Sequence, residues 1–99
     1  MTSKKLEILP VDTSEFLTDE ETIQEYLRLA VEDNDPEYFL IALGNVAKAR
    51  GMSEIARKSG LSREGLYKAL SPNSHPRHET LQKILGALGF EFTIKPISV

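Results

Sequence analysis

Residues 62–68 bring five different polar groups together: the hydroxyl of Ser62, the guanidinium of Arg63, the carboxylate of Glu64, the phenol of Tyr67 and the ammonium of Lys68. An arginine can donate two hydrogen bonds to one guanine edge, and serine and tyrosine hydroxyls can reach bases or phosphates. Glu64 could accept a hydrogen bond from a cytosine amine, or it could simply repel DNA. This set of groups indicates hydrogen bonding to double-stranded DNA rather than bond-making chemistry.

Further residues are candidates for contacts to the phosphate backbone, which position a protein on DNA without specifying sequence. Arg57, Lys58, Lys68 and Arg77 carry the positive charge that such contacts need. Ser53 begins a predicted helix whose free amides and dipole could hold a phosphate. The lysines and Arg57 could equally be solvated surface charges.

Residues 52–70 have the spacing of small, turn and apolar residues that a helix-turn-helix requires. Ala56 is expected where the two helices cross, because a larger side chain there would push them apart. Gly60 supplies the positive-φ residue of the turn, and Leu61 closes the turn against the core. An ordinary αα-hairpin of the same composition is the alternative. The inner faces would be buried by Ile55, Leu66 and Leu70.

The flanking segments predict three more helices and one strand. Thr18-Asp19-Glu20-Glu21 is a capping box, and apolar residues recur at helical spacing as far as Asn34. A second helix begins with Asp35 as N-cap and Pro36 as its first residue, and Gly51 closes it. Ser53 and Ser62 are expected to cap helices over 54–59 and 63–70, and a last helix spans about 77–88. Apolar and polar residues then alternate, which predicts a short strand over 90–95.

A lone strand has no partner within this chain. Its most economical partner is the same strand of a second copy, so a two-fold homodimer is expected. Such a dimer would present two reading helices to half-sites about 34 Å apart. The predicted fold class is all-α: a five-helix helix-turn-helix domain over residues 18–99, with a short C-terminal β-strand used in dimerisation and an N-terminal arm over residues 1–17.

The 99 residues fit a single domain, and the net charge of −3 conceals a segregation. Residues 1–36 carry three basic and ten acidic side chains, net −7, whereas residues 47–83 carry eight basic and three acidic, net +5. An acidic front beside a basic middle indicates two partners of opposite charge, although solvated surface charge would give the same totals. The chain has no cysteine and no apolar run close to the roughly 18 residues of a membrane span, so we expect a cytoplasmic protein that does not bind a membrane.

Two histidines invite a metal-site interpretation, which the sequence does not favour. His75 and His78 lie in or beside a turn-rich loop without cysteines or an acidic cluster at ligand spacing. Glu79 beside His78 lacks the nucleophile and the pocket of a catalytic dyad. We therefore expect no metal, no cofactor and no enzymatic activity.

Taken together, these motifs resemble a known family. The run from Tyr38 to Leu70, centred on Gly-Leu-Ser-Arg-Glu-Gly-Leu-Tyr-Lys-Ala-Leu at 60–70, is similar to the addiction-module antidote proteins, a HigA-like branch of the lambda-repressor-like helix-turn-helix class. The resemblance covers roughly residues 15–95. It implies a repressor of its own operon that also neutralises a small ribonuclease-like toxin of the RelE/ParE superfamily. By position, it assigns the DNA face to Ser62, Arg63, Tyr67 and Lys68.

One stretch departs from that family pattern. The loop before the last helix usually has the form Asn-Pro-x-Phe, whereas here it is His75-Pro76-Arg77-His78. A histidine therefore stands where an apolar residue usually packs.

Three functions remain open on the sequence alone. In the first, the protein is an antitoxin whose acidic arm and first helix cover a small basic toxin while its middle binds operator DNA. In the second, it is a stand-alone repressor of the same fold, which the absence of an adjacent small basic reading frame would favour. In the third, it is a protein-interaction module that has lost DNA binding, which Glu64 and the negative total charge favour.

Overall fold

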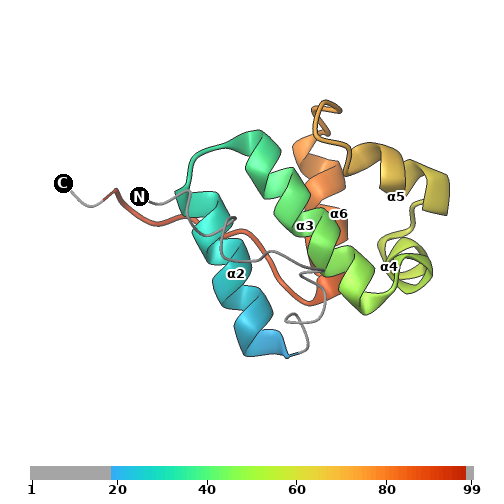
Figure 1. The fold of residues 1–99 in the computed structure, drawn as a ribbon, viewed down its shortest axis with the longest axis horizontal. Helices are drawn as coiled ribbons and strands as arrows, with labels where there is room; N and C mark the ends of the chain where they lie inside the picture. Colours follow the sequence, from blue (N-terminus) through green and yellow to red (C-terminus); the bar gives the residue numbers. More distant parts are fainter. Residues whose placement is uncertain (1–18, 98–99) are drawn as a thin grey trace.

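The computed structural model describes residues 19–97, and this part of the chain is all-helical. Figure 1 shows α2 and α3 side by side as an antiparallel pair, with α5 at the opposite end of the molecule from α2. Between these ends α4 packs against α3, α5 and α6, so it links the two halves of the fold. The predicted arm over residues 1–17 lies outside the described residues. The helices are α2 (Glu20–Glu32), α3 (Pro36–Arg50), α4 (Met52–Ser59), α5 (Arg63–Ala69) and α6 (His78–Leu88).

Side-chain caps begin three of these helices. The Asp35 carboxylate accepts hydrogen bonds from the amides of Glu37 and Tyr38 at the start of α3, as predicted. At α2 the capping box predicted Thr18 as the N-cap, which was wrong by one residue. The N-cap is Asp19, whose carboxylate accepts a hydrogen bond from the Thr22 amide at 2.7 Å. Asp19 has the extended backbone of an N-cap, and its negative charge favours the positive end of the helix dipole.

The prediction that Ser53 caps the next helix was also wrong. Gly51 ends α3 and at the same time begins α4, so Ser53 lies inside the first turn of α4. The positive φ of 103° at Gly51 lets the chain change direction within one residue, and the Gly51 carbonyl already accepts from the Ile55 amide. A helix that starts this early leaves no role for a serine cap.

The core lies where α2, α3, α4, α5 and α6 meet. The predicted apolar faces are buried, and the largest fully buried side chains come from four of the five helices. Val31, which the spacing placed on the inner face of α2, instead lies in the last turn with 54% of its surface exposed. The largest fully buried side chains are Ile23, Leu43, Val46, Leu66 and Ile84.

No helix among residues 19–97 is long and apolar enough to cross a membrane.

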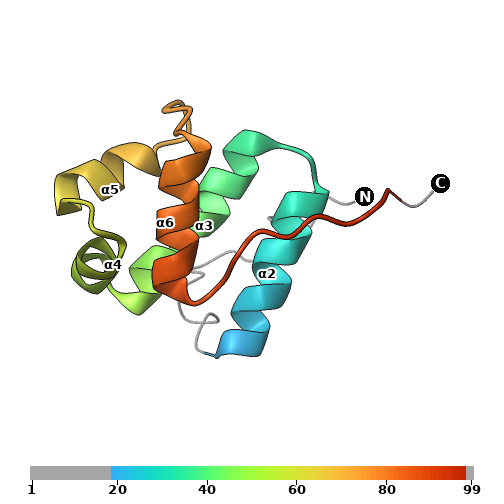
Figure 2. The ribbon, with the colours of Figure 1, turned by 180° about the vertical axis from the view of Figure 1, so that it is seen from behind.

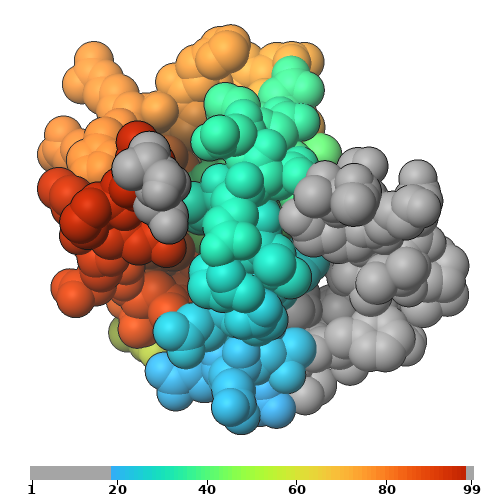
Figure 3. Space-filling view, turned by 90° about the vertical axis from the view of Figure 1, so that its left-hand side faces the viewer, coloured from blue at the N-terminus to red at the C-terminus, as the bar shows by residue number. Residues whose placement is uncertain are grey.

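The predicted strand over 90–95 was wrong for the single chain, because no strand occurs in the described residues. A strand requires backbone hydrogen bonds to a neighbouring strand, and within residues 19–97 nothing offers one to this segment. We call residues 90–97 the tail. The tail lies along the second half of α2 (Figures 2 and 3). Its Phe92 ring centroid lies 5.2 Å from that of His78 and 6.3 Å from that of Phe39.

Candidate nucleic-acid interface

The turn between α4 and α5 has the geometry that the sequence predicted. Gly60 adopts a left-handed conformation, with φ 81° and ψ 8°. Ala56 is buried in the core, and Leu61 is half-buried against it. The Ser59 hydroxyl donates to the Ala56 carbonyl and accepts from the Leu61 amide, which fixes the exit from α4. The turn therefore holds α5 at a defined angle to α4.

The outer face of α5 presents the predicted cluster of polar side chains to solvent. Ser62 is the N-cap of α5, and its hydroxyl accepts from the Gly65 amide at 2.9 Å. The Arg63 guanidinium lies over the ring of Tyr67, 5.6 Å from its centroid, with a hydrogen bond to the phenol at 3.5 Å. This contact restricts the arginine side chain, which remains exposed to solvent. Exposed side chains on this face are Ser62, Arg63, Glu64, Tyr67 and Lys68.

The cations of α4 are exposed but not free. Glu54 contacts Arg57 at 2.6 Å and Lys58 at 3.6 Å. The hydrogen bond from Arg57 lowers the pKa of Glu54, and the same contact raises the pKa of Arg57. Ser53 is exposed on the first turn of this helix. Because Glu54 shares its charge with both cations, α4 offers less positive charge than its composition suggests.

Other cations near α5 have no such counter-charge. Arg77 is exposed as the N-cap residue of α6. Within residues 19–97, no ion pair involves Lys68 or Arg77, nor Lys48 and Arg50 in the last turn of α3. The sequence analysis missed Lys48 and Arg50, because the candidate phosphate contacts predicted from the sequence all lie between residues 53 and 77. A net positive run at the end of α3 was the available signal.

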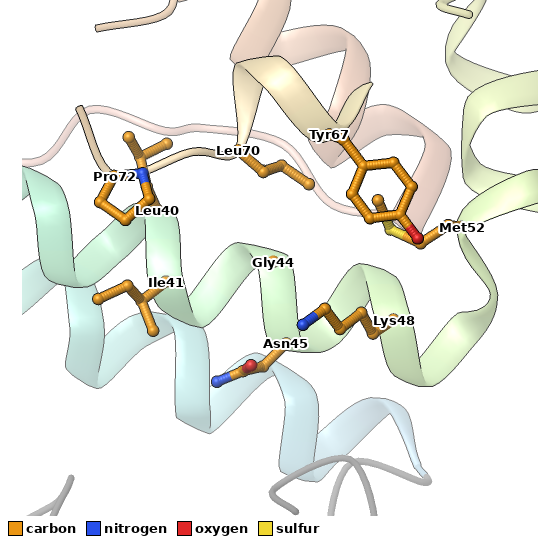
Figure 4. Close-up of a pocket in the computed structure, with 9 residues that line it drawn as sticks. All are labelled: Leu40, Ile41, Gly44, Asn45, Lys48, Met52, Tyr67, Leu70 and Pro72. Atoms are coloured by element: carbon orange, nitrogen blue, oxygen red, sulfur yellow. The ribbon is translucent and has the colours of Figure 1, made fainter. Parts of the chain in front are cut away.

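A small hollow adjoins this surface between α3 and α5. Its volume is about 260 Å³, and in Figure 4 Tyr67 of α5 and Leu70, the residue that follows α5, lie across it from Ile41 and Lys48 of α3. The lining is mainly apolar, and its polar residues are Asn45, Lys48 and Tyr67. Tyr67 thus belongs both to the exposed face of α5 and to this hollow, which links α5 to α3.

Comparison with known proteins places this arrangement in a family. The family model described as "probable addiction module antidote protein" matches residues 7–96. The chain belongs to this addiction-module antidote family. It is also 48% identical over 84 residues to a protein of Haemophilus influenzae described as uncharacterized, a match that covers 85% of this chain and 87% of the relative. No solved structure matches the chain.

The loop before α6 shows how this antidote accommodates its unusual histidine. His78 is the first residue of α6, and its ring stacks on Phe92 of the tail at an interplanar angle of 27°. His75 takes a positive φ of 51° in the loop. Residues 19–97 contain no group of three or more histidine, cysteine or acidic side chains that could hold a metal ion. In the antidote, His75 thus lies in the loop and His78 packs against the tail.

Proposed function

We propose that this protein is the antitoxin of a type II toxin–antitoxin module, which binds its operator as a homodimer, represses its own operon and neutralises a RelE/ParE-like toxin. Membership of the antidote family supports the toxin half of the proposal. The exposed face of α5 supports the DNA half. A lambda-repressor-like, HigA-like mode of binding would insert α5 into the major groove with its N-terminus leading.

The observation that carries the DNA proposal is the exposed position of Arg63 at the start of α5. Arg63 is the first residue of α5, where a reading helix contacts base edges. Its contact with Tyr67 reduces the conformational freedom that binding would otherwise remove. Candidate phosphate contacts are Lys68 in the last turn of α5, Lys48 across the hollow from Tyr67, and Arg77 at the start of α6. Arg57 and Lys58 would have to exchange Glu54 for a phosphate, so we expect them to contribute less.

The test is operator binding by a charge-matched pair of variants. Arg63→Ala should weaken binding to a duplex from the promoter of its own gene by about 1–3 kcal/mol, and it should relax specificity at one base pair. Arg28→Ala removes the same charge from an exposed site on α2, at the far end of the fold. Binding is measured by fluorescence anisotropy against a shuffled duplex at several salt concentrations.

The outcomes separate the candidate functions. A loss confined to Arg63→Ala supports base recognition by α5. Equal losses in both variants would show that charge alone governs binding. No operator binding by the wild type would favour the protein-interaction module over a repressor.

The charge on α2, at the opposite end of the molecule from α5, indicates where the toxin would bind. The exposed acids of α2 and its caps include Glu20, Glu21 and Glu32, whereas Arg28 is held between Glu25 and Glu32. We expect this acidic end and the arm over residues 1–17 to cover a small basic toxin. Deleting residues 1–17 should weaken binding to the product of an adjacent small basic reading frame while leaving operator affinity nearly unchanged. If such a reading frame is absent, the stand-alone repressor becomes the better interpretation.

A further inference from the structure

The tail exposes apolar surface that nothing in the described chain covers. Ile94 is 99% exposed and Ile97 is 84% exposed. Phe92 is still 38% exposed, although its ring lies against those of His78 and Phe39. Among residues 19–97, no backbone-to-backbone hydrogen bond involves residues 91–97. An extended segment with free amides, free carbonyls and exposed isoleucines is a template for pairing with another chain.

The sequence of the tail is complementary to itself about Thr93. If two copies run antiparallel with Thr93 opposite Thr93, then Glu91 of each copy lies opposite Lys95 of the other. In the same register Phe92 lies opposite Ile94. Directly opposed side chains share one face of an antiparallel pair, and opposite-charge and aromatic–aliphatic pairs stabilise it. Pro96 has no amide hydrogen to donate, which limits the paired segment to residues 91–95.

We propose that the homodimer is formed by antiparallel pairing of the tails of two copies, centred on Thr93. The proposal rests on the homodimer of the proposed function and names its interface. Charge complementarity selects the occupant, because a second copy supplies a lysine for each Glu91 and a glutamate for each Lys95. A shift by one residue in this register would place Phe92 opposite a polar residue and separate the charges.

The anchored Phe92 explains how so short a pair could be stable. A two-stranded ribbon alone is at best marginal in water. Here the Phe92 ring already contacts those of His78 and Phe39, so pairing orders fewer residues than it would in a free peptide. Pairing then places Ile94 of each copy beside Phe92 of the other copy, and this contact removes the exposed apolar surface of Ile94 from water.

The test exchanges the two charges and measures the mass of the full-length protein by sedimentation equilibrium from low micromolar to submillimolar concentration. The wild type should be dimeric at the upper end. Glu91→Lys makes both symmetry-related pairs like-charged and should weaken the dimer about tenfold or more. Lys95→Glu should do the same, whereas the double exchange Glu91→Lys/Lys95→Glu should restore the dimer. Both residues are exposed, so circular dichroism should show unchanged folding.

Mixing the two single variants is the sharpest control. One variant then carries two lysines and the other two glutamates, so the mixture should form heterodimers as tight as the wild-type dimer. A monomeric wild type, single variants that remain as dimeric as the wild type, or a double exchange that fails to recover would each overturn the proposal. Operator binding is measured in parallel. If the dimers form and depend on these charges but the protein does not bind the operator, the proposed function is refuted and the tail pairing is not. If binding is normal and depends on Arg63, but the charge exchanges leave the molecular mass unchanged, only the tail pairing is refuted.

Discussion

Replacing Gly60 by alanine should destabilise the turn between α4 and α5 through the backbone alone. Gly60 has φ 81° and ψ 8°, and a Cβ added there would meet no atom within 4 Å, so no steric clash arises. The left-handed conformation costs an L-residue about 1–2 kcal/mol. Alanine also restricts the unfolded chain, which offsets about 0.4–1 kcal/mol of that cost. The free energy of unfolding should therefore fall by about 1 kcal/mol, measured by urea denaturation followed by circular dichroism.

The matched control is Gly86→Ala in α6. A Cβ at Gly86 also meets nothing within 4 Å, but this glycine lies inside a helix. Alanine there should raise the free energy of unfolding by about 0.5–1 kcal/mol. Gly60→Asn should lose less than Gly60→Ala, because asparagine visits the left-handed region more readily. A Gly60→Ala variant as stable as the wild type, beside a stabilised Gly86→Ala, would refute the left-handed turn.

Three further variants test the packing and the caps, each by the same denaturation. Leu66→Ala, at a fully buried position of α5, should lose about 2–5 kcal/mol. Gly65→Ala puts a Cβ 3.0 Å from the Ser62 hydroxyl, so the helix-propensity gain of about 1 kcal/mol should be largely cancelled by the disturbed cap. The hydrogen bond from Thr22 lowers the pKa of the Asp19 carboxyl below its ordinary value of 3.8. The ionised Asp19 cap therefore stabilises the folded protein fully above pH 3.8, and this contribution is lost as the pH falls through the lowered pKa. Asp19→Asn keeps a capping oxygen without titrating and should show a smaller loss of stability on acidification.

Local signals predicted most of the helix boundaries. Asp35, Ser62 and Gly89 act within a few residues of themselves, through a cap hydrogen bond or a left-handed conformation, so the sequence around them is sufficient. The N-caps of α2 and α4 are also set locally, but the prediction chose the wrong one of two nearby candidate residues for each. Asp19 displaced Thr18 at α2, and Gly51 started α4 before Ser53 could cap it.

Features that depend on the packing of distant segments were not predictable in the same way. Arg63 and Tyr67 were named individually, but their mutual contact appears only once α5 is formed. Lys48 joins the surface around α5 because α3 passes beside it, which its position in the sequence does not reveal. The alternation over 90–95 indicated an extended segment but could not show that the Phe92 ring would dock on those of His78 and Phe39. That contact joins α3, α6 and the tail across more than fifty residues of sequence.

A net charge of −3 does not argue against DNA binding in this fold, because charges act locally in salt solution. Screening reduces interactions beyond about 8 Å at physiological ionic strength, whereas the molecule measures 38 × 33 × 26 Å. The acids of α2 lie at the opposite end from α5 (Figure 1), so they barely alter the potential that a phosphate would experience there. Glu54 acts at close range on Arg57 and Lys58, and it therefore matters more than all the carboxylates of α2. Glu54→Gln should accordingly strengthen operator binding and increase its salt dependence, whereas Glu21→Gln at the far end should change neither.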